Sequence, residues 1–436
     1  MTEAAGKLLV VQVAGLGYDF LQGRDSSEWR GLVFHPMESP FPALTCTVQA
    51  GFRTGQGPSR HGVVSNGVFS RELMRPFFWE QSASLVTGPR VWDSLRRRGK
   101  RVAMLFWQQS LGESVDIVIS PAPIHRHDGD MVPACYSKPR DLYPRLCAAV
   151  GRKFDLKRYW GPLASAKSSD WIAEATAALI RDESLAPDLC LTYLPVLDYS
   201  LQRYGPADGR SRKALDALLA ELRLLLIAAR EANYEVVVFG DYAIGPSARG
   251  AAFPNQALRR AGFLREREVE GRKYADLWDS AAFAMVDHEI AHVYVKRPAD
   301  VEPVQRLLAN LPGVGEVLTA EAQRNRSIAH PRCGDLLLIA AEGYWFAYPW
   351  WEKRGEEPDY AGHVDIHNKP GYDPCELFFG WPPFSVSRRA SRIRGSHGRN
   401  GADRRTCWAA TWHVGHNPVN AMDLALTCIN WFDQKH

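Results

Sequence analysis

The sequence predicts an α/β protein with a mainly parallel central sheet and helices on both faces. Short apolar runs bounded by turn or polar residues recur along the chain, as is typical of parallel strands that are covered on both sides. They span 8–13, 102–106, 188–194, 235–239 and 336–340. Helical patterns lie between them, and the clearest runs from about Ser211 to Ala232 with leucines at three-to-four-residue spacing. Alternating strands and helices favour a parallel sheet.

The composition is that of a globular protein. The chain has 436 residues, of which 46% are hydrophobic and 23% charged, and no run of about 18 apolar residues is present to span a bilayer. Its N-terminus lacks the pattern of a secretory signal, so we expect a soluble, cytoplasmic protein without a membrane partner. Eight scattered cysteines without a Cys-x-x-Cys pair indicate reduced thiols rather than a disulfide framework or a zinc ribbon.

The basic residues give no indication of nucleic-acid binding. The formal net charge is +4, and Lys and Arg are distributed along the chain except between Arg388 and Arg405. Such a stretch is more typical of a solvated surface loop than of a nucleic-acid footprint. The sequence does not predict an oligomeric state.

The pattern from about Val286 to Leu318 differs from the rest. A strand at 292–295, a helix at 301–311 and a strand at 313–318 predict a small inserted unit. We therefore expect a core α/β domain over 1–280, a small α+β lobe or cap over 281–335, and a return to the core over 336–436. The aromatic segment Trp345–Trp351 is typical of core or lid packing.

Thr45 is the candidate reactive residue. It follows a proline turn and precedes a helical pattern, which would place its hydroxyl where backbone N–H groups and the helix dipole stabilise an attached anion. That position suits a nucleophile that attacks phosphorus. The alternative is that Thr45 or Thr47 only caps the helix.

This segment resembles a known family. The order Pro42-x-x-Thr45, Thr54-Gly55, Pro58-Ser-x-His-Gly62 and Asn66 is similar to the nucleophile segment of the type I phosphodiesterase and nucleotide pyrophosphatase branch of the alkaline phosphatase superfamily. The resemblance implies an alkaline phosphatase-like fold with Thr45 as the nucleophile. It also places His61 on a structural turn rather than at a metal.

Three later segments resemble the metal-binding motifs of that family in the same order. They are the Asp198 segment ending in Gly205-Pro206, the Asp241-Tyr242 pair, and Gly395-Ser-His397-Gly. The resemblance implies Asp198, Asp241 and His397 as ligands of divalent metal.

The departures from the family pattern are as informative as the matches. Ala14, Gln202 and Tyr242 stand where the family has an aspartate and two histidines, so a pair of tetrahedral zinc sites cannot be assembled from these positions. One or two ions of Zn, Mn or Mg remain the expected cofactor. Segments between Trp160 and Pro374 resemble a bacterial subgroup of alkaline phosphatase family proteins, and this resemblance implies that the same changes are a feature of the subgroup.

Three explanations stay open. A single ion could be held by Asp198, Asp241 and His397, with Gln202 or water completing the shell. Replacement ligands could come from elsewhere, or the site could have lost hydrolytic chemistry. The candidate replacements are His288, His292 and His367. His288 and His292 would share one face of a helix, although 291–295 is more typical of a strand, and structural hydrogen bonding is the alternative for all three.

The function expected from the resemblance is a metal-dependent hydrolase of phosphodiesters, phosphomonoesters or phosphonates that forms a covalent phosphothreonine at Thr45. Val48 stands where the family often has an asparagine that contacts the phosphoryl oxygen, and Gln49 could substitute for it. The partner is then a small phosphorylated or phosphonate substrate. The alternatives are a tailoring or transferase enzyme, or a catalytically impaired ligand-binding protein on the same fold.

Overall fold

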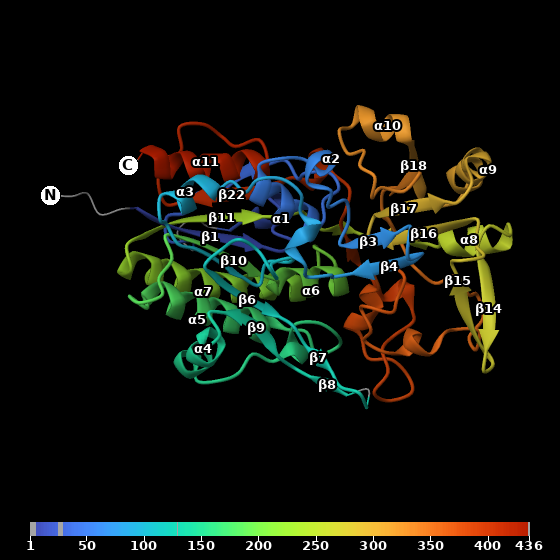
Figure 1. The fold of residues 1–436 in the computed structure, drawn as a ribbon, viewed down its shortest axis with the longest axis horizontal. Helices are drawn as coiled ribbons and strands as arrows, with labels where there is room; N and C mark the ends of the chain where they lie inside the picture. Colours follow the sequence, from blue (N-terminus) through green and yellow to red (C-terminus); the bar gives the residue numbers. More distant parts are fainter. Residues whose placement is uncertain (1–5, 25–28, 129, 435–436) are drawn as a thin grey trace.

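The computed structural model describes residues 6–24, 29–128 and 130–434, which are built around an eight-stranded sheet (Figure 1). Its order is β2-β22-β11-β1-β10-β5-β6-β9. The five inner strands from β11 to β6 are parallel. They are β1 (Lys7–Val13), β5 (Val102–Leu105), β6 (Ile117–Pro121), β10 (Leu189–Leu194) and β11 (Tyr234–Gly240). The expected mainly parallel sheet is confirmed.

The edges of this sheet are antiparallel. β9 (Cys135–Lys138) pairs with β6 at one edge, and β2 (His35–Met37) lies at the other. Between β2 and β11 lies β22 (Thr406–Ala410), which pairs with both. A strand near the C-terminus, which no sequence pattern predicted, therefore completes the central sheet.

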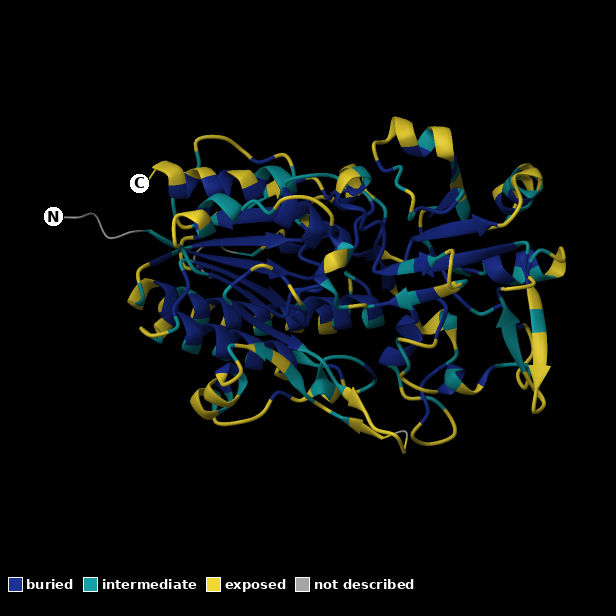
Figure 2. Cartoon of the chain, in the orientation of Figure 1, coloured by how far each residue is buried: buried dark blue, intermediate teal, exposed yellow. Residues whose placement is uncertain are grey.

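Helices cover both faces of the sheet, as expected (Figure 1). One layer contains α5 (Ala166–Arg181), α6 (Val196–Tyr204) and α7 (Gly209–Glu231), and the other contains α1 (Thr45–Thr54), α3 (Asp93–Arg97) and α11 (Ala421–Gln434). The predicted helix over 211–232 is α7, whose Leu215, Leu218 and Leu222 are buried in the main core. In Figure 2 the strands of the central sheet are dark blue, the colour that marks buried residues.

A second, four-stranded sheet of order β16-β17-β19-β18 lies at the right of Figure 1. Its strands are all antiparallel: β16 (Ala282–Asp287), β17 (Ile290–Val295), β18 (Val314–Thr319) and β19 (Leu336–Ala340). The run 336–340 was expected to be a parallel strand of the central sheet, and that expectation was wrong. Five consecutive buried apolar residues also fit an inner strand of a small covered sheet, so the run alone does not identify its partner.

His288 and His292 do not share a helix face. They lie in a β16–β17 hairpin whose turn residue His288 has φ 60°. The helices beside this sheet are α8 (Pro254–Arg260), α9 (Pro298–Ala309) and α10 (Ala320–Asn325).

The remaining elements are short. They are α2 (Pro58–His61), α4 (Leu142–Val150), β3 (Gly67–Ser70), β4 (Arg75–Phe78), β7 (Ile124–His125), β8 (Met131–Val132), β12 (Gly245–Pro246), β13 (Gly250–Ala252), β14 (Arg265–Val269), β15 (Arg272–Asp276), β20 (Tyr344–Phe346) and β21 (Gly395–Ser396). Trp345, Trp350 and Trp351 are buried, which confirms that the aromatic segment serves packing. None of the described helices is long and apolar enough to cross a bilayer.

Candidate active site

Thr45 is the first residue of α1, close to the carboxyl ends of β10 and β11. Leu44, with extended backbone, occupies the N-cap position and makes no side-chain cap hydrogen bond. Thr45 therefore does not cap the helix. Its hydroxyl instead donates a hydrogen bond to the Tyr242 hydroxyl at 3.4 Å. Because the side chain is only 3% exposed, this hydroxyl lies at the buried end of the site.

Asp198 links this hydroxyl pair to a longer chain of polar groups. It lies in the first turn of α6, directly after β10. The Tyr242 hydroxyl donates to Asp198 Oδ1 at 3.0 Å, and the Gln202 amide donates to Oδ2 at 2.6 Å. Gln202 Oε1 in turn accepts a hydrogen bond from the Tyr372 hydroxyl at 3.0 Å. Burial raises the pKa of Asp198, whereas the donors to both oxygens favour the ionised form.

Asp241 follows β11 and has a different kind of environment. Its Oδ1 accepts from the backbone N–H groups of Gly15 at 3.0 Å and Tyr242 at 2.9 Å, and its Oδ2 accepts from the Gln12 amide at 3.0 Å. Burial raises the pKa of this carboxyl to about 8. The carboxylate therefore ties the loop after β1, which carries Ala14, to the loop after β11.

Four aromatic rings form a column beside Asp198. The Tyr242 ring stacks on His397 with centroids 3.5 Å apart and planes 2° apart. The His288 ring lies 3.8 Å from His397 on one side and 3.8 Å from Tyr372 on the other. Such close stacking leaves these side chains little freedom to rotate.

Each imidazole in the column is fixed through Nδ1 and leaves Nε2 without a hydrogen-bond partner. His397 Nδ1 contacts the Ala43 carbonyl oxygen at 2.8 Å, and His288 Nδ1 contacts Asp287 Oδ1 at 2.7 Å. Both buried Nε2 atoms lack a partner, and that of His397 lies 4.0 Å from Asp198 Oδ1. Burial lowers the pKa of His397 well below its usual value. Buried polar atoms in proteins nearly always have a hydrogen-bond partner, so we expect a bound ligand to contact these two nitrogens.

Asp287 joins the small sheet to the start of α1. Its Oδ2 accepts from the Ser65 hydroxyl at 2.7 Å and the Asn66 N–H at 2.8 Å, and Asn66 Nδ2 lies 3.2 Å from Oδ1. Asn66 Oδ1 then accepts the N–H of Cys46 at 3.0 Å. The position of His288 beside the site therefore depends on contacts with the nucleophile segment, which no spacing in the sequence reveals.

The other candidate residues are engaged elsewhere. His292 contacts the Val64 carbonyl through Nε2 and accepts the Gly334 N–H at Nδ1, each at 3.1 Å. His367 is exposed, and Gln49 Oε1 accepts the Gln108 N–H at 2.7 Å. His61 Nδ1 accepts the N–H of Val63 at 3.1 Å, as a structural turn residue would. His292, His367 and Gln49 thus do not join the Thr45 cluster.

The residues present do not fit a divalent ion. Within residues 6–24, 29–128 and 130–434, no three His, Cys, Asp or Glu side chains are grouped so as to hold one. In the expected set of Asp198, Asp241 and His397, both oxygens of each carboxylate already accept hydrogen bonds from protein donors. Asp241 Oδ1 accepts two of these hydrogen bonds, so ligation through that oxygen would require a donor to be displaced.

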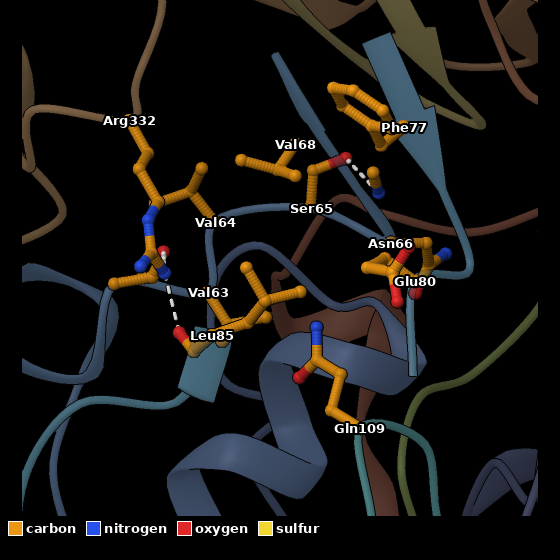
Figure 3. A pocket seen from close by; sticks show the side chains of 12 residues that line it. Val63, Val64, Ser65, Asn66, Val68, Phe77, Glu80, Leu85, Gln109 and Arg332 are labelled. Carbon is orange, nitrogen blue, oxygen red and sulfur yellow. Dashed lines mark hydrogen bonds between the residues drawn. The ribbon is translucent and has the colours of Figure 1, made fainter. Parts of the chain in front are cut away.

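Two cavities flank the cluster without being lined by Thr45. One of about 290 Å³, including space open to solvent, is lined by Asn66, Gln109 and Arg332 among others (Figure 3). The other, of about 210 Å³, is lined by Trp79, Trp160 and Tyr372 among others. Because Tyr372 also contacts Gln202 and His288, it forms the wall between the second cavity and the polar chain.

Residues 27–373 match the family model described as type I phosphodiesterase / nucleotide pyrophosphatase. The chain belongs to this family. It is therefore an enzyme of the phosphodiesterase/phosphatase type within the alkaline phosphatase superfamily, and members of this family are metal-dependent. No curated protein sequence matches the chain significantly.

Solved structures share the fold at low identity. Phosphonoacetate hydrolase from Sinorhizobium meliloti 1021 is 14% identical with a TM-score of 0.65, and the match covers 99% of this chain and 96% of that one. Murine ectonucleotide pyrophosphatase / phosphodiesterase 5 is 15% identical with a TM-score of 0.59, covering 98% and 95%. The human protein of the same name is 14% identical with a TM-score of 0.60, also covering 98% and 95%. These likenesses confirm the alkaline phosphatase-like fold.

Proposed function

We propose that this protein hydrolyses small phosphate esters or phosphonates, with the Thr45 hydroxyl as the nucleophile. The observation that carries the proposal is the place of Thr45 at the start of a ten-residue helix, with its hydroxyl bonded to Tyr242 next to Asp198. A phosphoryl group attached there would meet the positive end of the helix dipole. Attack by Thr45 would give a phosphothreonine that water then hydrolyses.

The unpaired nitrogens of the ring column support an anionic substrate. His288 Nε2 and His397 Nε2 are buried and lack partners, and phosphoryl oxygens are strong acceptors for an imidazole N–H. Nδ1 of His397 faces a carbonyl oxygen and Nδ1 of His288 faces a carboxylate oxygen, so Nδ1 is the donor in each ring. Nε2 can therefore donate to a phosphoryl oxygen only in a ring that carries both protons. These two nitrogens would then orient the phosphoryl group beside Thr45.

The cavity bounded by Tyr372 is the candidate place for the leaving group. Its Trp79 and Trp160 rings lie 6.3 Å and 5.6 Å from the Tyr372 ring, so it offers aromatic surface to an organic group. The solved relatives agree with such a substrate, since the bacterial hydrolase has been crystallised with phosphonoacetate and the murine protein with AMP. Tyr372 would have to shift for a substrate to reach both places.

We propose that the small sheet acts as a cap that places His288 beside the candidate site. We propose a core α/β domain over 1–280, a cap over 281–335 extended by β19, and a return to the core up to 436. We assign no step to a metal ion, because the donor set does not fit one. Eight free cysteines suit a reducing compartment, and we propose a cytoplasmic location.

The test is turnover of nitrophenyl phosphate monoesters, nitrophenyl phosphodiesters, nitrophenyl phosphonates and phosphonoacetate by the full chain. Thr45→Ala should lose at least about 100-fold in kcat/KM for the substrate that is turned over, and Thr45→Ser should keep part of it. Thr47→Ala is the matched control, because this buried threonine lies two residues along the same helix and its hydroxyl has no hydrogen-bond partner. Mass spectrometry of acid-quenched protein should locate the phosphoryl group on Thr45.

Equal turnover by the wild type and Thr45→Ala would contradict the proposal. So would a wild-type protein that binds inorganic phosphate but turns over none of the four substrate classes. That second result would instead favour a ligand-binding protein on this fold.

A further inference from the structure

We propose that residues 379–386, the aromatic loop, bind the surface of a lipid bilayer that contains anionic lipids. The loop lies between β20 and β21, and neither the candidate site nor the proposed function makes use of it. The proposal does not rest on the role of Thr45. It also gives a task to the arginine-rich stretch that begins at Arg388, which the sequence pattern alone describes only as a solvated surface loop.

The tip of the aromatic loop exposes large apolar side chains to solvent. Phe384 is 99% exposed and Trp381 is 72% exposed, while Phe379 at the start of the loop is 58% exposed. The two residues between the first pair, Pro382 and Pro383, are exposed as well. Single exposed apolar residues are common on protein surfaces, but a contiguous group of this kind is typical of a contact with a partner.

The backbone of the aromatic loop is held by hydrogen bonds within the loop. Phe379 and Val386 form an antiparallel bridge. The Gly380 N–H donates to the Ser385 carbonyl at 2.8 Å, and the Ser385 N–H donates to the Pro382 carbonyl at 3.1 Å. Gly380 has no room for a side chain, because a Cβ there would lie 2.1 Å from the Val386 carbonyl oxygen. The fold therefore fixes the backbone that presents the aromatic rings to solvent.

Two arginines are bonded to the backbone of the aromatic loop. Arg388 Nη2 donates to the Trp381 carbonyl at 2.7 Å, and Arg392 Nη1 donates to the Phe379 carbonyl at 2.9 Å. The Arg392 guanidinium also lies 4.2 Å from the centroid of the Phe378 ring. Cationic side chains thus lie directly behind the apolar tip.

The charge of this part of the chain is of one sign. Residues 377–402 contain five arginines and no aspartate or glutamate. Arg388 is paired with Glu357, but Arg389 and Arg392 are exposed, and neither forms an ion pair with a carboxylate of residues 6–24, 29–128 and 130–434. A surface of this kind attracts a partner that carries negative charge.

The arrangement of apolar and cationic groups fits a lipid surface. At a bilayer interface, Trp and Phe side chains enter the boundary between head groups and acyl chains, while Arg side chains contact the anionic head groups. The tip from Trp381 to Phe384 carries no cation, and the arginines lie at its base. A single-stranded nucleic acid would instead favour a basic groove along which aromatic rings are spaced to stack successive bases. The bilayer is therefore the partner that the loop fits.

Such a contact needs no membrane-spanning segment. A scan of the sequence for apolar runs of about 18 residues detects only segments that span a bilayer, and none of the described helices could cross one. A surface contact made by a few aromatic side chains and arginines is reversible. It would replace the expectation of a protein without a membrane partner, and it is compatible with a cytoplasmic location.

The test is co-sedimentation of the full chain with vesicles of phosphatidylcholine that contain about 30% phosphatidylserine, compared with vesicles of phosphatidylcholine alone. The wild type should bind the anionic vesicles at least about fivefold more tightly, and this difference should shrink as salt is raised. The double variant Trp381→Ser/Phe384→Ser should bind the anionic vesicles at least about tenfold more weakly than the wild type. Arg389→Glu should weaken binding to the anionic vesicles about threefold or more, with little effect on the neutral ones.

Trp278→Ser is the matched control. Trp278 is 65% exposed, but it lies between Asp276 and Asp279 rather than among arginines, so this variant should bind vesicles as the wild type does. The altered side chains are all exposed, so the unfolding midpoint of each variant, measured by circular dichroism, should stay within about 2 °C of the wild type. Turnover of small nitrophenyl esters by the double variant should equal that of the wild type, so this proposal can fail while the proposed function stands.

Three results with vesicles would overturn the proposal: no binding of the wild type to anionic vesicles, equal binding by the double variant, or equal binding of the wild type to both kinds of vesicle. It is also overturned if the wild type ignores vesicles but dimerises in sedimentation velocity and the double variant does not, which would identify a second copy of this chain as the partner. Binding of an oligothymidylate in place of vesicles, lost in the double variant, would identify a nucleic acid instead.

Discussion

Asp198 and Asp241 follow strands on either side of β1, yet their surroundings differ. Asp241 accepts hydrogen bonds from two backbone N–H groups and one amide, and all three donors belong to the loops and strand that frame the sheet. Asp198 accepts from Tyr242 and Gln202, and the first of these leads to the Thr45 hydroxyl. One carboxylate has become part of the scaffold, whereas the other remains connected to the reactive group. The type of residue alone does not reveal this division.

The largest effect on stability should come from removing the Asp241 carboxylate. Asp241→Ala leaves the Gln12 amide and the N–H groups of Gly15 and Tyr242 buried without an acceptor, so we expect the free energy of unfolding to fall by roughly 3–5 kcal/mol. Denaturant unfolding followed by circular dichroism measures it. The control is Asp216→Ala, which removes an exposed ion pair with Arg24 and should cost less than about 1 kcal/mol. Equal losses would contradict the scaffold role.

Asp198→Asn tests the other side of the comparison. The amide keeps the size of the side chain but removes the negative charge that orients the Tyr242 hydroxyl next to Thr45, so kcat should fall at least about 100-fold. The unfolding midpoint should move much less than in Asp241→Ala, because the new amide oxygen can accept from Tyr242 and the Gln202 amide can turn to accept from the new amide nitrogen. Steady-state kinetics and thermal unfolding of the same preparation provide both numbers. A variant that is unstable but active per folded molecule would reverse the assignment.

The pH dependence of the unfolding free energy tests a residue that lies outside the candidate site. Burial lowers the pKa of His292 to about 4, below the usual value near 6.5. The unfolded chain therefore binds a proton first, so the stability due to neutral His292 is present above about pH 6.5 and is lost as pH falls toward 4. Each pH unit in that window costs roughly 1.4 kcal/mol. His292→Gln should flatten the dependence of unfolding free energy on pH by about that slope relative to the wild type, and an unchanged slope would contradict it.

The smallest expected effect is that of metal on stability. Since the donor set does not fit an ion, 0.1 mM zinc or manganese should shift the unfolding midpoint by less than about 1 °C, because a ligand raises stability only when it binds the native state. Differential scanning fluorimetry with and without chelator measures it. A rise of several degrees would show that the Asp198 side rearranges to bind metal.

Much of the fold could be predicted because it is encoded locally. The strand runs that became β1, β5, β10 and β11 are predominantly apolar, and the leucines of α7 recur at helical spacing between Leu215 and Leu226. The run 336–340 failed because an apolar segment carries no information about its partner strand. The pairing of β22 with β11 joins residues more than 160 positions apart, which no local pattern records.

The candidate site could also be predicted only in part. Thr45, Asp198, Asp241 and His397 could be identified from motifs and do converge, although their roles stay predictions. The expected contributions of His292, His367 and Gln49 depended on geometry that the residue types do not encode. His288 was predicted only as one of several possible replacement ligands. Its position beside the site follows from the contacts of Asp287 with Ser65 and Asn66.

The position of β22 has a consequence for synthesis on the ribosome. β2 is made early, but its partner in the sheet, β22, emerges only after almost the whole chain has been translated. Until then β11 presents an open edge, and such edges readily pair with other chains. We therefore expect nascent chains stalled before residue 406 to need chaperone protection, and release of the last segment to be the event that closes the sheet.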